Sequence, residues 1–155
     1  RSRPIDEMIV IADASCLITL DNPNETHLLP KLYQEICVTP EVAAEVGPSL
    51  PEWVLLQSSA NQTLIDKLSE DLEVGEATSI ALALEVPNCL LIIDEKKGRR
   101  EAIRLGLEIT GTFGILMKGL EAGFIDEADT IVERVEQVGF RISESLKDGM
   151  KGKIQ

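Results

Sequence analysis

Two short apolar runs, each closed by an aspartate, constrain the fold of this chain more than any other feature. Residues 8–12 precede Asp13, and residues 89–93, within a strand expected at 88–93, precede Asp94. Continuous apolar runs of this length are typical of strands buried on both faces, as in a parallel sheet covered by helices. Aromatic residues make up only 3% of the chain, so the core has to be built from aliphatic side chains. The sequence therefore predicts an α/β fold.

Helical segments alternate with further strand segments along the chain. Strands are expected at 36–38, 53–56 and 107–109, and helices at 27–35, 40–46, 62–68, 74–84, 95–105, 113–121 and 126–138, with another beginning near Cys16. The helix at 40–46 has the clearest start, because Thr39 is a good N-cap and Pro40 suits the first helical position. This alternation predicts right-handed βαβ crossovers and a mostly parallel central sheet.

The length of 155 residues suits one domain. Residues 1–7 are polar and precede a methionine, and we interpret them as a remnant left from cloning. Residues 8–142 are expected to form the domain, and residues 143–155, which contain two glycines and three lysines, a loosely held tail.

The chain is acidic, with a formal net charge of −12. This balance argues against non-specific binding to DNA or to an anionic membrane, but it allows a nucleic-acid substrate that is held by local charge or by a metal ion. The three cysteines lack metal-binding spacing and suggest free thiols in a reducing cytoplasm. No segment is long and apolar enough to span a bilayer, and no signal peptide is evident.

Asp13 and Asp94 both follow strands, and ligands of open parallel sheets bind beyond the carboxyl ends of the strands. If the two strands are neighbours, both carboxylates face one crevice. Each aspartate alone also fits a simpler role, as the N-cap of the helix that follows.

Two glutamates are weaker candidates. Glu76 lies in the first turn of a nearly apolar helix, where the helix dipole favours a carboxylate whether or not it binds metal. Glu45 lies near the end of its helix and, taken alone, is better explained as a solvated surface residue.

In chain order these residues resemble the PIN domain family. They are most similar to its VapC-like prokaryotic subgroup, which carries Gly-Glu-Ala, here at 75–77, and Asp-Glu-Lys-Lys-Gly-Arg-Arg, here at 94–100. The resemblance runs from residue 8 to about residue 123 and rests on five motifs: Asp13-x-Ser15, Thr39-Pro-x-Val-x-x-Glu45, Gly75-Glu76-Ala77, Leu-Ile-Ile-Asp94 and Thr110-Gly-Thr112. It implies a three-layer α/β/α fold and a ribonuclease. Asp13, Glu45, Glu76 and Asp94 then match the family's acidic quartet, with Ser15 and Thr112 in supporting roles. Glu76 departs from the aspartate that many relatives carry.

The resemblance also implies cofactors and partners. Hard carboxylate oxygens suit Mg²⁺ or Mn²⁺, and two such ions could activate water and stabilise the leaving oxygen during RNA hydrolysis. We expect Asp13 and Asp94 to be inner ligands, Glu76 to hold a second ion and Glu45 to orient a water molecule. An antitoxin protein and a homodimer or higher oligomer are the expected protein partners.

A basic run follows Asp94 and is the candidate RNA-binding surface. It contains Lys96, Lys97, Arg99, Arg100 and Arg104. These side chains could contact phosphates that flank the scissile bond. Alternatively, they form a solvated helix face that pairs with Glu95 and Glu101.

Two other functional classes stay open. One is a catalytically weak or inactive PIN-like scaffold that acts through oligomerisation or protein binding. The other is a phosphatase or phosphoacceptor domain, which is disfavoured because Asp13-Ala-Ser15 lacks the Asp-x-Asp that haloacid-dehalogenase phosphatases need. His27 is the single histidine and is distant in sequence from every candidate acid, so we expect it to have a structural role.

Overall fold

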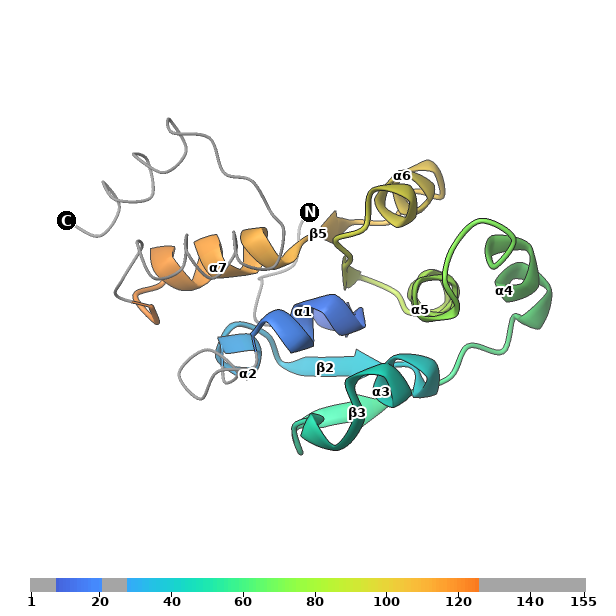
Figure 1. The fold of residues 1–155 in the computed structure, drawn as a ribbon. Coiled ribbons are helices and arrows are strands. Elements are labelled where there is room, and N and C mark those ends of the chain that lie inside the picture. Colours follow the sequence, from blue (N-terminus) through green and yellow to red (C-terminus); the bar gives the residue numbers. More distant parts are fainter. Residues whose placement is uncertain (1–7, 21–27, 126–155) are drawn as a thin grey trace.

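The computed structural model describes residues 8–20 and 28–125, which form a five-stranded parallel sheet covered by helices (Figure 1). The strand order is β3-β2-β1-β4-β5. The strands are β1 (Ile9–Ala12), β2 (Glu35–Val38), β3 (Val54–Leu56), β4 (Cys89–Ile92) and β5 (Ile109–Thr110). Every pairing is parallel, as the continuous apolar runs predicted.

The centre of the sheet is the pairing of β1 with β4, two strands that are far apart in sequence. Val10 pairs with Leu90, and Ala12 pairs with Ile92. The chain builds outward from β1 to β3 on one side of this pair and from β4 to β5 on the other. The junction is therefore the switch point of the sheet, where open α/β folds place their ligand crevice.

Helices cover both faces of the sheet, which gives three layers. They are α1 (Ala14–Thr19), α2 (Leu28–Leu32), α3 (Pro40–Val46), α4 (Gln62–Leu68), α5 (Val74–Glu85), α6 (Lys96–Arg104) and α7 (Thr112–Glu121), with a short 3₁₀ turn at Gly47–Ser49. One core cluster joins α1, α2, α3 and α7 to one face. A second cluster joins α4, α5 and α6 to the other face. Figure 1 shows α7, α1 and α2 apart from α4, α5 and α6.

The side chains of β1 point alternately to the two faces of the sheet, so they enter the two core clusters in turn. Val10 and Ala12 belong to the first cluster, and Ile11 belongs to the second. All three are 0% exposed, so β1 is buried on both faces. This explains why its sequence is apolar throughout and does not alternate.

Local sequence signals explain the start of α3 and its attachment to α5. Thr39 caps α3 by accepting a hydrogen bond from the backbone of Val42 at 3.3 Å, and Pro40 occupies the first turn, as predicted. The Thr39 hydroxyl also lies 2.9 Å from that of Thr78 in α5. Two buried threonines therefore link the helices that carry Glu45 and Glu76.

Two predicted elements differ from the structure. The strand expected at 107–109 is found as β5 at Ile109–Thr110, and so begins two residues later. The helix expected at 27–35 is described only as Leu28–Leu32, because Glu35 already pairs with Ile9 in the sheet. The hydrogen bonds of the sheet therefore override the helical pattern. The expected helix at 126–138, the tail at 143–155 and His27 lie outside the described residues. Within the described residues, no helix is long and apolar enough to cross a membrane.

Candidate functional site

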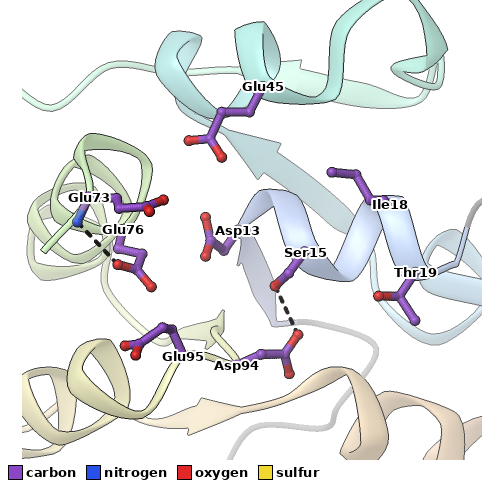
Figure 2. Close-up of a pocket in the computed structure, with 9 residues that line it drawn as sticks. All are labelled: Asp13, Ser15, Ile18, Thr19, Glu45, Glu73, Glu76, Asp94 and Glu95. Atoms are coloured by element: carbon purple, nitrogen blue, oxygen red, sulfur yellow. Dashed lines mark hydrogen bonds between the residues drawn. The ribbon is translucent and has the colours of Figure 1, made fainter. Parts of the chain in front are cut away.

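An acidic pocket opens at the carboxyl ends of β1 and β4, with a volume of about 460 Å³ (Figure 2). Its lining contains six carboxylates and, among the described residues, no basic side chain. The lining residues are Asp13, Ser15, Ile18, Thr19, Glu45, Glu73, Glu76, Asp94 and Glu95. The fold thus brings together all four acids that the motifs singled out, from four separate segments of the chain.

Asp13 lies at the centre of the pocket in Figure 2, between the other acids. It occupies the N-cap position of α1, yet its side chain makes no capping hydrogen bond. The residue is 7% exposed, and burial raises the pKa of its carboxyl to about 6. The backbone N–H of Ala14 opposes this rise, whereas the charges of neighbouring acids add to it. The simpler capping role therefore does not account for Asp13.

Glu76 is buried in the first turn of α5 and is held by a capping box. Its Oε1 accepts a hydrogen bond from the backbone nitrogen of Glu73 at 3.2 Å, while the Glu73 side chain caps the N3 backbone in return. Glu76 is 7% exposed, and burial raises its pKa to about 7, with the Asp13 and Glu95 charges contributing. The second carboxylate oxygen takes no part in the capping box and can serve a ligand.

Glu45 reaches the pocket from α3, although the residue is largely exposed. Its carboxylate points from α3 toward the acids on the other helices (Figure 2). Partial burial raises its pKa, and the charge of Glu73 adds to the effect. Glu45 is therefore part of the acidic cluster.

Asp94 is oriented by three hydrogen bonds. The Ser15 hydroxyl donates to Oδ2 at 2.9 Å, and Thr112 donates from its backbone nitrogen to Oδ1 at 2.7 Å and from its hydroxyl to Oδ2 at 2.5 Å. The N-cap of α6 is the next residue, Glu95, which accepts from Lys97 and Gly98. Asp94 is therefore not the cap of the helix that follows it, and Ser15 and Thr112 fix its orientation.

Comparison with protein families gives a match over most of the chain. A family model described as PIN domain matches residues 9–154. The chain belongs to the PIN domain family. The family is one of nuclease-type domains, and the parallel sheet with helices on both faces agrees with its fold. Comparisons with curated proteins and with solved structures found no match.

Two acids of this PIN domain line the pocket without having been singled out by the motifs. Glu73 lies three residues before Glu76, and Glu95 directly follows Asp94. A signal for the first exists in the sequence, because an acid three residues before a first-turn glutamate is a capping-box pattern. For Glu95, the sequence predicts only a pairing with the basic residues of the same helix. Both are exposed, and both raise the pKa of Glu76.

The basic run of the PIN domain is divided between two sides of α6. Arg99 donates from Nη1 to the backbone carbonyl of Ile93 at 2.7 Å, and it lines a small cavity beside Asp94. Lys97, Arg100 and Arg104 instead line a groove of about 550 Å³ between α4 and α6. Its other charged lining residues are Lys67, Glu70, Asp71 and Glu101. Lys96 is exposed, and Arg104 pairs with Glu101. The run therefore does not form one continuous surface.

The pocket acids of this PIN domain supply carboxylate oxygens, the type of donor atom that suits a divalent cation. Six carboxylates crowd one pocket, and the raised pKa values of Asp13, Glu45 and Glu76 reflect burial and mutual repulsion that a cation would relieve. As the side chains stand in the described residues, no three acids, cysteines or histidines form a group that could hold a metal ion. In Figure 2 the Asp94 carboxylate is turned toward Ser15. Metal ligation would therefore require these side chains to converge.

Proposed function

We propose that this PIN domain is a metal-dependent endoribonuclease that hydrolyses phosphodiester bonds in RNA. The supporting observation is the meeting of two buried acids, Asp13 and Glu76, with Asp94 and Glu45 in a pocket that no described basic residue lines. The anionic backbone of RNA could not enter such a pocket unless a cation neutralised the acids. Hard oxygen donors select Mg²⁺ or Mn²⁺.

Each acid has a role that follows from its surroundings. Asp13 and Asp94 lie closest to the β1–β4 junction and would be the inner metal ligands. Glu76 would hold a second ion through the oxygen that the capping box leaves available, and Glu45 would orient a water molecule from the opposite wall. When bound, Mg²⁺ or Mn²⁺ would supply a water nucleophile near neutral pH and stabilise charge on the leaving oxygen.

Ser15 and Thr112 would act as supporting residues. Both donate hydrogen bonds to Asp94, so they fix the direction of its carboxylate. Thr112 opens α7, which places the partial positive charge of a helix N-terminus beside Asp94. This arrangement holds an acid ready for a cation.

The substrate would be a single strand of RNA that crosses the acidic pocket. Lys96, Lys97 and Arg100 extend from α6, directly after the pocket residues Asp94 and Glu95, and would contact flanking phosphates. Arg99 would contact a phosphate from the side of β5, where it lies beside Asp94. The remaining acidic surface would repel RNA elsewhere, so we expect weak overall affinity.

A toxin of a toxin–antitoxin pair, acting in the cytoplasm as a homodimer or higher oligomer, is the biological setting we propose. It rests on the Gly75-Glu76-Ala77 and Asp94-Glu-Lys-Lys-Gly-Arg-Arg motifs that resemble the VapC-like subgroup. The neighbouring reading frame tests it. A small gene for a DNA-binding antitoxin would support the proposal, and an unrelated neighbourhood would count against it.

The nuclease proposal is tested with labelled single-stranded RNA, double-stranded RNA and DNA in Mn²⁺ or Mg²⁺. We expect cleavage of single-stranded RNA that EDTA abolishes and that Asp13→Asn lowers about 10²–10³-fold. Glu41→Gln is a matched control for Glu45→Gln, because Glu41 lies one turn earlier on α3 and does not line the pocket. Intact RNA in every metal, with no difference between wild type and Asp13→Asn, would refute the proposal.

A second candidate is a PIN-like scaffold that is catalytically weak or inactive and acts through oligomerisation or protein binding. One observation favours it, because the described acids form no group that is ready to hold a metal ion. The resemblance adds a second reason, since it implies an aspartate where this chain has Glu76. Calorimetry with Mn²⁺ separates the candidates. Binding that Asp94→Asn removes would support the nuclease, and no heat of binding together with no cleavage would support the scaffold.

A further inference from the structure

Gly75 stands at the second position of α5, where its own backbone does not require a glycine. The described glycines with positive φ are Gly47, Gly106 and Gly123, and Gly75 is not among them. Alanine is the better helix former, and the rest of α5 is rich in alanine. A glycine at this position therefore needs an explanation from its surroundings.

The explanation lies in the wall of the acidic pocket. A β-carbon at position 75 would lie 2.2 Å from Oε1 of Glu45 and 3.2 Å from its carboxyl carbon. It would lie 3.5 Å from Oδ1 of Asp13, which is ordinary van der Waals contact. The conflict is therefore with one carboxylate only. The missing methyl group leaves the space that the Glu45 carboxylate occupies beside Asp13.

The mobility of the two partners determines what an added methyl group would do. The backbone of α5 is packed in the core, with Gly75, Glu76 and Ala77 all buried. Glu45, in contrast, is largely exposed, and its carboxylate lies at the end of a flexible side chain. Because the side chain can rotate toward solvent at little cost, a methyl group at position 75 would move the carboxylate and leave the helix in place.

Gly111 offers an instructive contrast. A β-carbon there would lie 2.8 Å from Oδ1 of Asp94 and 2.9 Å from Nη1 of Arg99. Both of these atoms are fixed, since Asp94 Oδ1 accepts from Thr112 and Arg99 Nη1 donates to Ile93. A substitution at 111 would therefore disturb several contacts at once, so position 75 gives the cleaner test.

We infer that Gly75 is a positioning residue of the active site: by lacking a side chain, it admits the Glu45 carboxylate into the acid cluster. This inference rests on the proposed nuclease function for its effect on activity. The predicted position of the Glu45 carboxylate does not depend on that function, because it can be observed without substrate or metal.

The test is a double-mutant cycle between positions 75 and 45. We expect Gly75→Ala to lower kcat about 10–100-fold, to the level of Glu45→Gln, with little change in KM and no fall in Tm. Combined with Glu45→Gln, Gly75→Ala should cause no further loss, because the acid it displaces is already absent. Independent, multiplicative losses, or a fall in Tm of Gly75→Ala, would overturn the inference.

A shorter acid at position 45 provides a second double-mutant cycle. Aspartate at position 45 withdraws the carboxylate by one methylene, which makes room for a methyl group at 75. We expect Glu45→Asp to lose activity in the wild-type background, and Glu45→Asp with Gly75→Ala to lose no more than Glu45→Asp alone. A double variant clearly worse than both single variants would show that the methyl group acts by another route.

A crystal structure of metal-free Gly75→Ala separates this inference from the nuclease proposal. We expect α5 unchanged and the Glu45 carboxylate turned out of the pocket. If wild-type protein proves inactive on every RNA but this displacement is seen, the proposed function fails and the positioning role stands. If Glu45 keeps its place beside an alanine at 75, the positioning role fails whatever the activity.

Discussion

Thr112 holds both carboxylate oxygens of Asp94, through its backbone nitrogen at 2.7 Å and its hydroxyl at 2.5 Å. The N-cap residue of α7 is Gly111, which makes no side-chain cap. Asp94 therefore serves as the external cap of α7 while it faces the acidic pocket. A residue that is 18 positions away in sequence thus decides how this acid points.

The hydroxyl of Thr112 is predicted to matter for activity. Thr112→Val keeps the shape of the side chain and the backbone hydrogen bond but removes the donor to Oδ2. We expect a loss of about 10–100-fold in cleavage or in Mn²⁺ affinity, because outer contacts of this kind orient metal ligands. Thr112→Ser keeps the hydroxyl and should retain most of the activity. Equal activity of the valine and wild-type proteins would show that Ser15 orients Asp94 sufficiently.

The metal-free protein is predicted to lose stability as the pH rises from about 4 to 7. The folded-state pKa values of Asp13 and Glu76 are raised to about 6 and about 7, above their usual 3.8 and 4.5. The folded state therefore binds more protons than the unfolded state in this window, and stability falls as the acids ionise. Shifts of this size correspond to about 3 kcal/mol for each acid, and screening by solvent at the open pocket reduces this to roughly 2 kcal/mol.

Thermal unfolding in EDTA, measured between pH 4.5 and 8, checks this pH dependence. Asp13→Asn and Glu76→Gln should each flatten the profile, because a neutral side chain carries no ionisation cost. Addition of Mn²⁺ at pH 7.5 should raise Tm in the wild-type protein and less so in these variants. A wild-type profile that rises steadily toward pH 8 would contradict the prediction.

Arg99 is predicted to contribute to stability more than its neighbours in the basic run. Its guanidinium donates to the carbonyl of Ile93, the last residue before Asp94. Arg99→Ala should lower the free energy of unfolding by about 1–2 kcal/mol, since it removes a charge-assisted hydrogen bond to a partly buried carbonyl. Lys96→Ala, at an exposed position of the same helix, is the matched control and should change stability little. Chemical denaturation of both variants gives the comparison.

The groove between α4 and α6 is predicted to bind the RNA that flanks the pocket. Four basic residues line it beside three acids, and Arg104 is already paired with Glu101. Changing the other three, Lys67, Lys97 and Arg100, to glutamine should raise KM for a long RNA while kcat stays close to wild type. The slope of log binding constant against log salt concentration should become less negative by about 2, because three phosphate contacts with a single strand are lost. Lys118→Gln in α7, outside this groove, is the control. Unchanged KM and salt dependence would exclude the groove.

The meeting of Asp13 and Asp94 could be predicted on one condition, that the strands preceding them are neighbours in the sheet. Asp13 and Asp94 each follow an apolar run, and the ends of parallel strands meet at one edge once β1 pairs with β4. The role of Glu45 could not be derived from its own segment. Its inward direction depends on the space beside Gly75, which is a tertiary feature.

The basic run shows why the remaining features were harder to predict. Lys97 and Arg100 are three residues apart and share one face of α6, whereas Arg99 lies on the opposite face. The sequence contains this spacing but does not show which face meets α4 and which meets β5. Likewise, the early end of α2 follows from the pairing of Glu35 with Ile9, which no local propensity reveals.

The pairing of β1 with β4 has a consequence for the newly made protein. Asp13 is synthesised before the other pocket acids, since Glu76 and Asp94 follow it 63 and 81 positions later, and Thr112 follows later still. A nascent or prematurely ended chain that stops before β4 has no partner for β1 at the switch point and cannot assemble the pocket. A nuclease built in this way would be harmless to the messenger RNA and ribosome that produce it until most of the domain has left the exit tunnel.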